Sequence, residues 1–298
     1  MTATLAAGPR LAIKNILLGT DFSSCSNTAL SYARAMARRY GATLNVAHVM
    51  PTINAILVLS PEFGMDAAVH EDERIQEYIK QIESQLQSIA HQVLTPKGQV
   101  PDELARIIEE QGIDLLVLGT HGRTGVRKLV MGSVAEEIFR QVPCPVLTVG
   151  PNVCEASPEA KFRHILCATN FSRDSLAAVP HAIFFAQEDA ADLTLFHFIE
   201  QPPEGVQAKT RESLLRRLNQ LLPADAESRY HSRSMVEVGE LFASPAEGIL
   251  NAAERQKVDL IVLGVRVARG VRGLMTHLST TTAQVLTQAR CPVLTVHG

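Results

Sequence analysis

Tryptophan is missing from this 298-residue chain, and aromatic residues make up only 5% of it. Its five cysteines form no C-x-x-C pair, and an odd, sparse set suits a reducing compartment without structural disulfides. Its apolar runs are too short to cross a bilayer, and its first fifteen residues lack a continuous apolar h-region. Because 28 basic residues nearly balance 31 acidic ones, we expect no broad basic face for nucleic acid and no polybasic membrane anchor. These absences predict a globular, cytoplasmic protein.

What the sequence does contain is an internal repeat. Three segments of the first half recur in the second half. The segment from Asn15, "NILLGTDFSSCSNTALSYA", resembles the segment from His164, "HILCATNFSRDSLAAVPHA". Likewise "DLLVLG" recurs as "DLIVLG", and "CPVLTV" occurs twice. These blocks recur in one order with a period of about 147 residues, which is too long for a solenoid unit. We therefore predict two copies of one domain, at residues 1–150 and 161–298, with the proline-containing stretch 151–160 as the linker.

Within each copy, segments typical of strands alternate with segments typical of helices. The first copy has short apolar runs at 16–18, 44–49, 115–118 and 146–149, which favour strands buried on both faces. Between them, apolar residues recur every three or four positions from Ile75 to Val93, which predicts an amphipathic helix. "PDELARIIEEQG" has the proline start and glycine stop of a second helix. The alternation predicts a doubly wound α/β fold with an open, mainly parallel sheet.

A glycine-rich, basic loop follows the fourth predicted strand. In "LGTHGRTGVRKLVMGSVAEEI", Gly119 and Gly122 would let the backbone take positive φ and approach a ligand closely. Ser133 and Glu136 fit a capping box, so a helix is expected to begin at Gly132–Ser133, and its N-terminus favours a phosphate. Arg123, Arg127 and Lys128 could supply countercharge, or some of them could face solvent. The loop therefore predicts a phosphate-binding site.

The spacing of this loop distinguishes it from the commoner phosphate loops. It is neither the Walker A pattern nor G-x-G-x-x-G, because Lys128 is followed by Leu129 and His121 stands two residues after Gly119. It reads as Gly119, two residues, Gly122, nine residues, then Gly132 and a serine. This spacing, with "ILLGTDFS", "AHVMP" and "CPVLTV" in order, resembles the universal stress protein family over nearly the whole chain. The resemblance implies two tandem five-stranded sheets of strand order 3-2-1-4-5.

The family also implies an adenine nucleotide, usually ATP, with a Mg²⁺ ion held largely by phosphates and water rather than by protein ligands. Asp21 would contact the base or ribose, and Val49 the adenine. The ribose and first phosphates would lie against Leu118, Gly119 and Gly122. The outer phosphates would lie against Gly132, Ser133 and Val134. In chain order the candidate binding residues are Thr20, Asp21, Val49, Leu118, Gly119, His121, Gly122, Arg123, Gly132, Ser133 and Val134.

The second copy departs from this pattern. Val267 stands where Gly122 stood, Asn170 replaces Asp21, and Phe198 replaces Val49. A β-branched residue is unfavourable where the backbone needs positive φ, so we expect the second copy to bind ATP weakly or not at all. "TTAQ" from Thr281 fits a T-x-x-Q capping box, so a helix N-terminus is still expected, and a smaller anion could bind there.

Several residues also have plain structural interpretations. His121 could touch a phosphate or be held by backbone bonds in a surface loop. His48 and His197, at matching strand ends, are more typical of core-capping residues than of ligands. Asp21 could act only as a cap for the helix that follows it. The apolar stretch 50–70 is long for a crossover and could cover the site.

Three functions remain open at this level. We expect a nucleotide-dependent regulator of the stress response that hydrolyses ATP weakly at most, because the sequence names no base near the loop beyond His121. The alternatives are a slow ATPase or phosphoryl donor, and a scaffold that binds no nucleotide. The two "CPVLTV" strands would be sheet edges, and unpaired apolar edges are a liability. As in the family, we expect them to pair the two domains, and the chain could further form a homodimer.

Overall fold

A computed structural model describes residues 11–50, 64–120, 137–139, 141–154, 156, 159, 161–200, 207–224, 226–239, 243–265 and 279–298. The first domain contains β1 (Asn15–Gly19), α1 (Ser24–Tyr40), β2 (Thr43–Ala47), α3 (Gly64–Leu86), β3 (His91–Leu94), α4 (Val100–Gln111), β4 (Leu115–Gly119) and β5 (Val146–Val149). The second contains β6 (His164–Ala168), α6 (Arg173–Ala177), α7 (Val179–Asp189), β7 (Asp192–Ile199), α8 (Gln207–Asn219), α9 (Ala226–Arg229), β8 (Ser232–Val238), α10 (Pro245–Arg255), β9 (Leu260–Val265), α11 (Thr280–Gln288) and β10 (Val293–His297).

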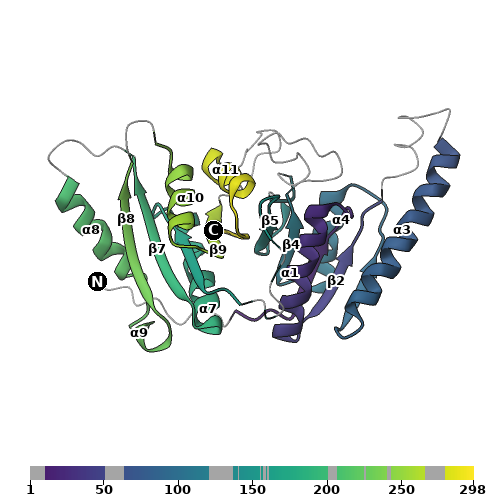
Figure 1. The fold of residues 1–298 in the computed structure, drawn as a ribbon, viewed down its shortest axis with the longest axis horizontal. Coiled ribbons are helices and arrows are strands. Elements are labelled where there is room, and N and C mark those ends of the chain that lie inside the picture. Colours follow the sequence, from purple (N-terminus) through teal and green to yellow (C-terminus); the bar gives the residue numbers. More distant parts are fainter. Residues whose placement is uncertain are drawn as a thin grey trace.

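In the described part of the chain, these strands form one ten-stranded sheet of order β3-β2-β1-β4-β5-β10-β9-β6-β7-β8. Each half has the order 3-2-1-4-5 with parallel pairing, which confirms the predicted fold class. The halves meet where β5 and β10 pair antiparallel, with Leu147 opposite Leu294. Figure 1 shows the two domains side by side, with β5 and β9 near the middle of the molecule.

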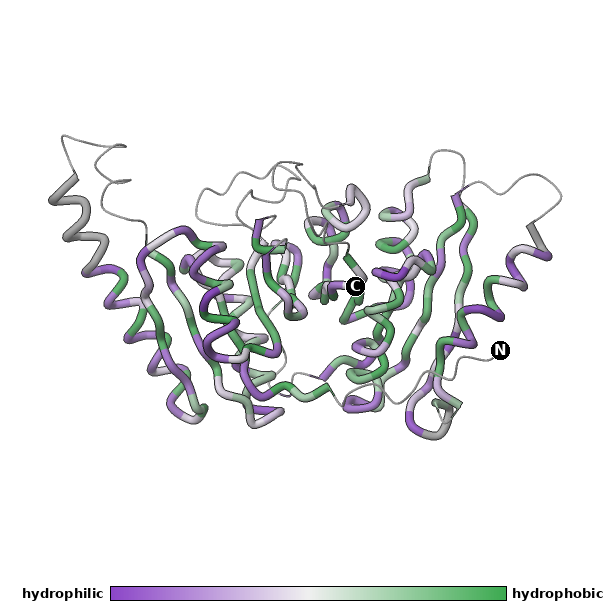
Figure 2. Tube along the Cα trace, turned by 180° about the vertical axis from the view of Figure 1, so that it is seen from behind, coloured by the Kyte–Doolittle hydropathy of each residue, from purple (hydrophilic) through white to green (hydrophobic). Residues whose placement is uncertain are grey.

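Helices cover both faces of the sheet, and the side chains of successive strand residues pack alternately against the two layers of helices. Ile16 and Leu18 join the core beneath α1, α3 and α7, whereas Leu17 joins the core beneath α4, α10 and α11. Because both faces are buried there, the inner strands β1, β4 and β9 are mostly apolar and run as hydrophobic segments through the centre of each half (Figure 2). The apolar runs that predicted buried strands are therefore explained by two-sided burial.

Two helix boundaries test the sequence signals directly. The predicted second helix is α4, with Pro101 in its first turn and Gly112 at its C-cap, where φ is 56°. The prediction of one helix through Val93 is wrong, because α3 ends at Leu86 and Val93 lies in β3. Val93 in the short strand β3 continued the helical spacing of the apolar residues by coincidence, so periodicity did not separate the helix from the strand.

The second domain also corrects a capping prediction. Helix α11 does begin near the predicted T-x-x-Q sequence, but its N-cap is Ser279, whose side chain accepts a hydrogen bond from the backbone N–H of Thr282. The helix N-terminus is therefore present, two residues earlier than the pattern placed it. No helix of the described residues is long and apolar enough to span a membrane.

Candidate functional site

The candidate site begins at a tight turn between β1 and α1, at the carboxyl end of β1. The Asp21 carboxylate oxygen Oδ1 accepts the backbone N–H of Ser23 at 3.0 Å and the hydroxyl of Ser26. Ser23 is the N-cap of α1 and accepts the N–H of Ser26. Asp21 thus braces the turn rather than capping the helix as its structural interpretation expected, and the residue stays partly exposed at the sheet edge. The turn and the first helical turn form one hydrogen-bonded unit.

Phe22, the residue after Asp21, has a φ of 61°, which is rare and costly for a bulky side chain. Ring contacts on both sides hold it there: the centroid of His48 lies 4.4 Å away, and Tyr78 of α3 stacks at 4.7 Å. His48 Nδ1 donates to the Thr20 carbonyl at 2.8 Å, because a carbonyl can only accept. His48 is therefore a buried core residue that fixes Thr20, as its spacing predicted.

The end of β4 lies against the same helical turn. A Cβ added to Gly119 would come within 3.0 Å of the Ser26 backbone nitrogen, while the Ser26 hydroxyl accepts the Asp21 N–H at 3.3 Å. Gly119 is not among the glycines with positive φ, so the positive φ predicted for it is wrong, whereas close approach to a ligand stays a prediction. Its missing side chain admits the α1 backbone, which brings β4 beside the Asp21 turn.

The structure thus brings together Thr20, Asp21, Leu118 and Gly119 where β1 and β4 diverge, the point of an open α/β sheet at which ligands bind. Leu118 is buried beneath this edge, and Val49 is partly exposed two residues beyond the end of neighbouring β2. The other predicted binding residues lie outside the described residues: His121, Gly122, Arg123, Gly132, Ser133 and Val134. Sequence reasoning missed Ser26 and Phe22; the serine-rich "TDFSSCS" was a usable signal for the first, and nothing marked the second.

The second domain repeats most of the turn, although Ser175 Oγ bonds to Thr169 Oγ1 and the Ser172 carbonyl where Ser26 Oγ bonds to Asp21. Phe171 has a φ of 62°, His197 Nδ1 contacts the Thr169 carbonyl at 2.7 Å, and the Ser172 N–H donates to Asn170 Oδ1 at 3.0 Å. Burial lowers the pKa of His197 and outweighs the opposing effect of the Thr169 carbonyl, which accepts the Nδ1 hydrogen. Arg217 of α8 replaces Tyr78 as the cover, 4.0 Å from the Phe171 ring centroid. The turn scaffold therefore does not depend on whether an aspartate or an asparagine follows the threonine.

What differs is the space beside the turn. Phe198, which stands where Val49 stands in the first domain, packs on two glycines: a Cβ on Gly248 would lie 2.2 Å from its ring, and one on Gly239 would lie 2.5 Å away. Glu103 occupies the position in α4 that matches Gly248 in α10. The second domain thus combines a large Phe198 with Gly248, where the first domain combines the smaller Val49 with the larger Glu103.

Replacing Gly264 at the end of β9 with alanine is expected to lower the free energy of unfolding by about 2 kcal/mol. The new Cβ would lie 2.0 Å from the Asp174 carbonyl oxygen and 2.4 Å from Ser175 Cα, both backbone atoms of α6 that cannot move alone. Gly119→Ala is the matched control, because its nearest contacts lie at 3.0 Å and its cost should be about half as large. Urea unfolding followed by circular dichroism measures both, and equal losses would contradict this account.

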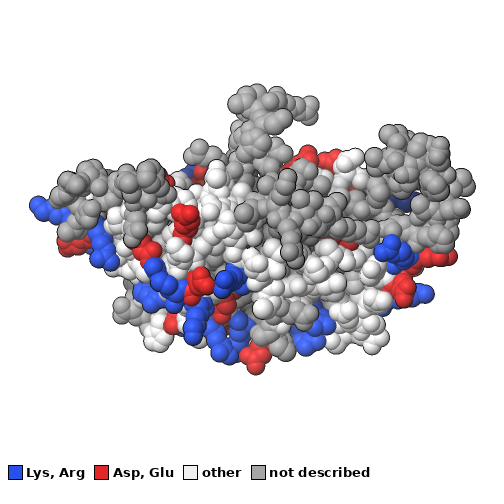
Figure 3. All heavy atoms as spheres, turned by 45° about the horizontal axis from the view of Figure 1, so that its top comes forward, with Lys and Arg blue, Asp and Glu red and all other residues white. Residues whose placement is uncertain are grey.

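Charges of both signs share the described surface. Basic and acidic residues are interspersed over the described surface of the face shown in Figure 3, in keeping with the balanced composition. Among the residues that the structure describes, no cluster of three histidine, cysteine, aspartate or glutamate side chains is placed to hold a metal ion. Cys25, Cys144, Cys167 and Cys291 are buried free thiols, and burial raises the pKa of Cys144 to about 12. The described cysteines thus offer no reactive nucleophile at this edge.

Comparison with known proteins finds one family. The model of the universal stress protein family matches residues 12–150 and again residues 161–297. Two universal stress proteins of Methanocaldococcus jannaschii are 25% identical over 152 residues and 29% identical over 140 residues. Each alignment covers 46% of this chain, and 94% and 81% of the respective relative. The crystal structure of a universal stress protein from Archaeoglobus fulgidus has the same fold, with a TM-score of 0.69, 19% identity, and coverage of 95% of this chain and 98% of the other.

Proposed function

The chain belongs to the universal stress protein family, and from this premise we propose that its first domain binds an adenine nucleotide, ATP above all. The observation that carries the proposal is the assembled edge at the β1–β4 divergence. There the Asp21 turn and the end of β4 meet on Ser26 at the N-terminus of α1. The Asp21 carboxylate, held in place by hydrogen bonds, can accept a ribose hydroxyl. Gly119 at the neighbouring strand end has no side chain, so the phosphates can approach the backbone closely.

Each described residue has a distinct part in this proposal. The Asp21 carboxylate accepts a ribose hydroxyl, and the partly exposed Val49 contacts the adenine ring. The Gly119 backbone lines the path of the phosphates. His121, Gly122, Arg123, Gly132, Ser133 and Val134, outside the described residues, complete the proposed set and hold the phosphates. Mg²⁺ would arrive with the phosphates and water, because the described residues present no protein cluster for it.

We propose that the second domain does not bind ATP. Phe198 fills the space beside the turn, and Asn170 offers a neutral oxygen where Asp21 offers a charged one. We further propose that residues 1–150 and 161–298 act as paired domains of a cytoplasmic regulator, with nucleotide occupancy in one domain as its signal. The antiparallel pairing of β5 with β10 supports the paired arrangement. A homodimer of the whole chain remains a further proposal.

Calorimetric titration of the full chain with ATP and Mg²⁺ tests the binding proposal. We expect a saturable heat with ATP and a much weaker one with GTP, since the proposed contacts recognise adenine. Incubation with Mg²⁺-ATP separates the regulator from the slow ATPase, because only the ATPase releases ADP in proportion to time. If no heat is observed with ATP, the scaffold function replaces the one proposed here.

A further inference from the structure

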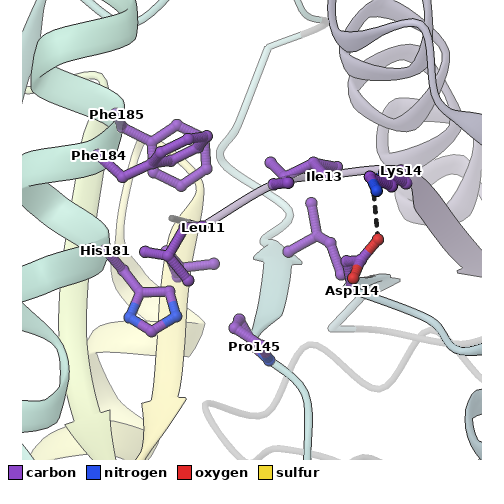
Figure 4. Close-up of a pocket in the computed structure, with 11 residues that line it drawn as sticks. Leu11, Ile13, Lys14, Asp114, Pro145, His181, Phe184 and Phe185 are labelled. Atoms are coloured by element: carbon purple, nitrogen blue, oxygen red, sulfur yellow. Dashed lines mark hydrogen bonds between the residues drawn. The ribbon is translucent and has the colours of Figure 1, made fainter. Parts of the chain in front are cut away.

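A cavity of about 330 Å³ lies at the seam of the two domains, away from the proposed nucleotide site. It sits at the amino ends of β1, β4 and β5, whereas Asp21 and Gly119 lie at their carboxyl ends. Both domains line it, with Leu11, Ala12, Ile13, Lys14, Asp114, Leu115, Pro145, His181, Phe184, Phe185 and Leu294. Figure 4 shows the segment from Leu11 to Lys14 crossing between α7 and the first domain, with His181 beside Leu11. Its volume is within the range of small-molecule sites.

A helix break places His181 in this wall. Pro180 has no N–H, and the N–H of His181 bonds to the Ala178 carbonyl, so α6 ends at Ala177 and α7 starts at Val179. His181 Nδ1 lies 3.3 Å from the Ala177 carbonyl. Because a carbonyl can only accept, Nδ1 carries the hydrogen and the ring is held at a fixed orientation.

The charge and tautomer of the His181 ring determine which groups it can bind. Burial lowers the pKa of His181 and outweighs the opposing effect of the Ala177 carbonyl, so the ring is neutral at pH 7. With its hydrogen on Nδ1, the neutral ring presents Nε2 as a hydrogen-bond acceptor. The Asp114 carboxylate is committed, because it accepts the backbone N–H groups of Lys14 and Asn15 at 2.8 and 2.9 Å. The lining thus favours an uncharged donor over an ion.

The corresponding groove of the first domain differs from the cavity in its side chains and in the segment of chain that covers it. There Tyr32 stands in the place of His181, and α1 continues without a break. The interdomain linker covers that groove: the Ala156 N–H donates to Ser31 Oγ at 2.9 Å, and Val153 is buried in the core. In the second domain Pro180 stands in the place of Ser31 and offers no such anchor. One of two related grooves is therefore occupied by the chain, and the other keeps an apolar cavity.

We propose that the seam cavity binds a small, uncharged aromatic molecule that carries one hydroxyl or N–H donor, with the donor bonded to His181 Nε2. Phe184 and Phe185, whose ring centroids lie 5.2 Å apart in an edge-to-face arrangement, supply the aromatic wall. Apolar side chains of both domains enclose the rest of the ligand, so its binding tightens the seam. The site is independent of the nucleotide proposed for the first domain.

Binding of 2-naphthol, a fluorescent aromatic alcohol, tests the proposal on the full chain. We expect one molecule per chain and an affinity about tenfold weaker in His181→Phe, which keeps the ring volume and removes the acceptor. 2-Methoxynaphthalene has no donor and should bind the wild type and His181→Phe equally. Tyr32→Phe is the matched control at the corresponding position, and it should leave 2-naphthol binding unchanged.

The outcomes separate cleanly. Absence of 2-naphthol binding overturns the proposal, as does an equal affinity of the wild type and His181→Phe. Equal weakening by Tyr32→Phe would place the probe elsewhere. A ¹⁵N spectrum gives a second readout that does not depend on affinity: His181 should show its hydrogen on Nδ1, and only its Nε2 signal should shift when 2-naphthol binds. Asp21→Asn should leave all of these results unchanged, which keeps the test separate from nucleotide binding.

Discussion

Replacing Arg39 with glutamine is expected to lower the free energy of unfolding by about 3 kcal/mol, because it leaves a buried carboxylate without its cation. Arg39 at the end of α1 forms an ion pair with Asp189 at the end of α7, and the Asp189 side chain has no exposed surface. Arg39 also donates to the Glu188 carbonyl at 2.8 Å, so it joins the two domains twice. Chemical denaturation monitored by circular dichroism measures the loss.

The stability lost in Arg39→Gln should depend on pH, and the pKa of Asp189 gives the direction of that dependence. Burial raises the pKa of Asp189, while the Phe162 N–H and Arg39 lower it by stabilising the charged form. A carboxyl whose folded pKa lies above its unfolded value stabilises the fold when protonated, and this contribution is lost as the pH rises through the folded pKa. The deficit of Arg39→Gln should therefore shrink as the pH falls from 7 toward 4.

A double variant controls for the loss of packing. Arg39→Gln combined with Asp189→Asn removes both charges, and the asparagine oxygen can still accept the Phe162 N–H. We expect this pair to recover most of the stability lost in Arg39→Gln. If Arg39→Gln alone matched the wild type within about 0.5 kcal/mol, the ion pair would not stabilise the seam.

Asp21→Asn is expected to weaken ATP binding about fiftyfold while leaving the fold intact. A hydrogen bond from a ribose hydroxyl to a charged oxygen is stronger than one to an amide, and in this variant the amide group replaces the carboxylate. The fold should survive, because the second domain forms the same turn with Asn170, whose oxygen accepts the Ser172 N–H at 3.0 Å without a bond to the serine hydroxyl of the helix. Titration of the variant with ATP measures the affinity, and circular dichroism checks the fold.

The reverse substitution provides the matched control. Asn170→Asp restores the carboxylate in the second domain, but Phe198 still packs on Gly248 beside it. We therefore expect no second ATP to bind in Asn170→Asp. If Asp21→Asn bound ATP as tightly as the wild type, the proposed ribose contact would be wrong, although the nucleotide could still bind elsewhere on the chain.

The parallel α/β fold and the sheet edge that holds the candidate residues were predictable from repeated, local patterns, whereas the strand order was implied by the resemblance to the family. Two-sided burial makes β1 and β4 continuously apolar, and parallel topology then places Asp21 and Gly119 at one edge. The end of α4 followed equally well from Gly112, since a positive φ at a helix C-cap is a property of one residue.

The parts that sequence reasoning missed depend on contacts between distant residues. Phe22 keeps a φ of 61° between His48 and Tyr78, and no local pattern predicts that for a phenylalanine. Gly119 is a glycine because the α1 backbone approaches it, rather than for a positive φ. The buried pair of Arg39 and Asp189 joins the ends of corresponding helices in the two domains. These ends carry opposite charges because the two copies differ there, so neither copy alone predicts the pair.

The central claim is that one domain of this tandem protein binds an adenine nucleotide and the other does not. Native mass spectrometry of the full chain with excess ATP tests it most directly, because it counts bound nucleotides on each molecule. We predict one ATP per chain, and about one sixth of that occupancy in Asp21→Asn at roughly ten times the Kd of the wild type. Two nucleotides per chain would contradict the asymmetry between Val49 and Phe198, and none would contradict nucleotide binding itself.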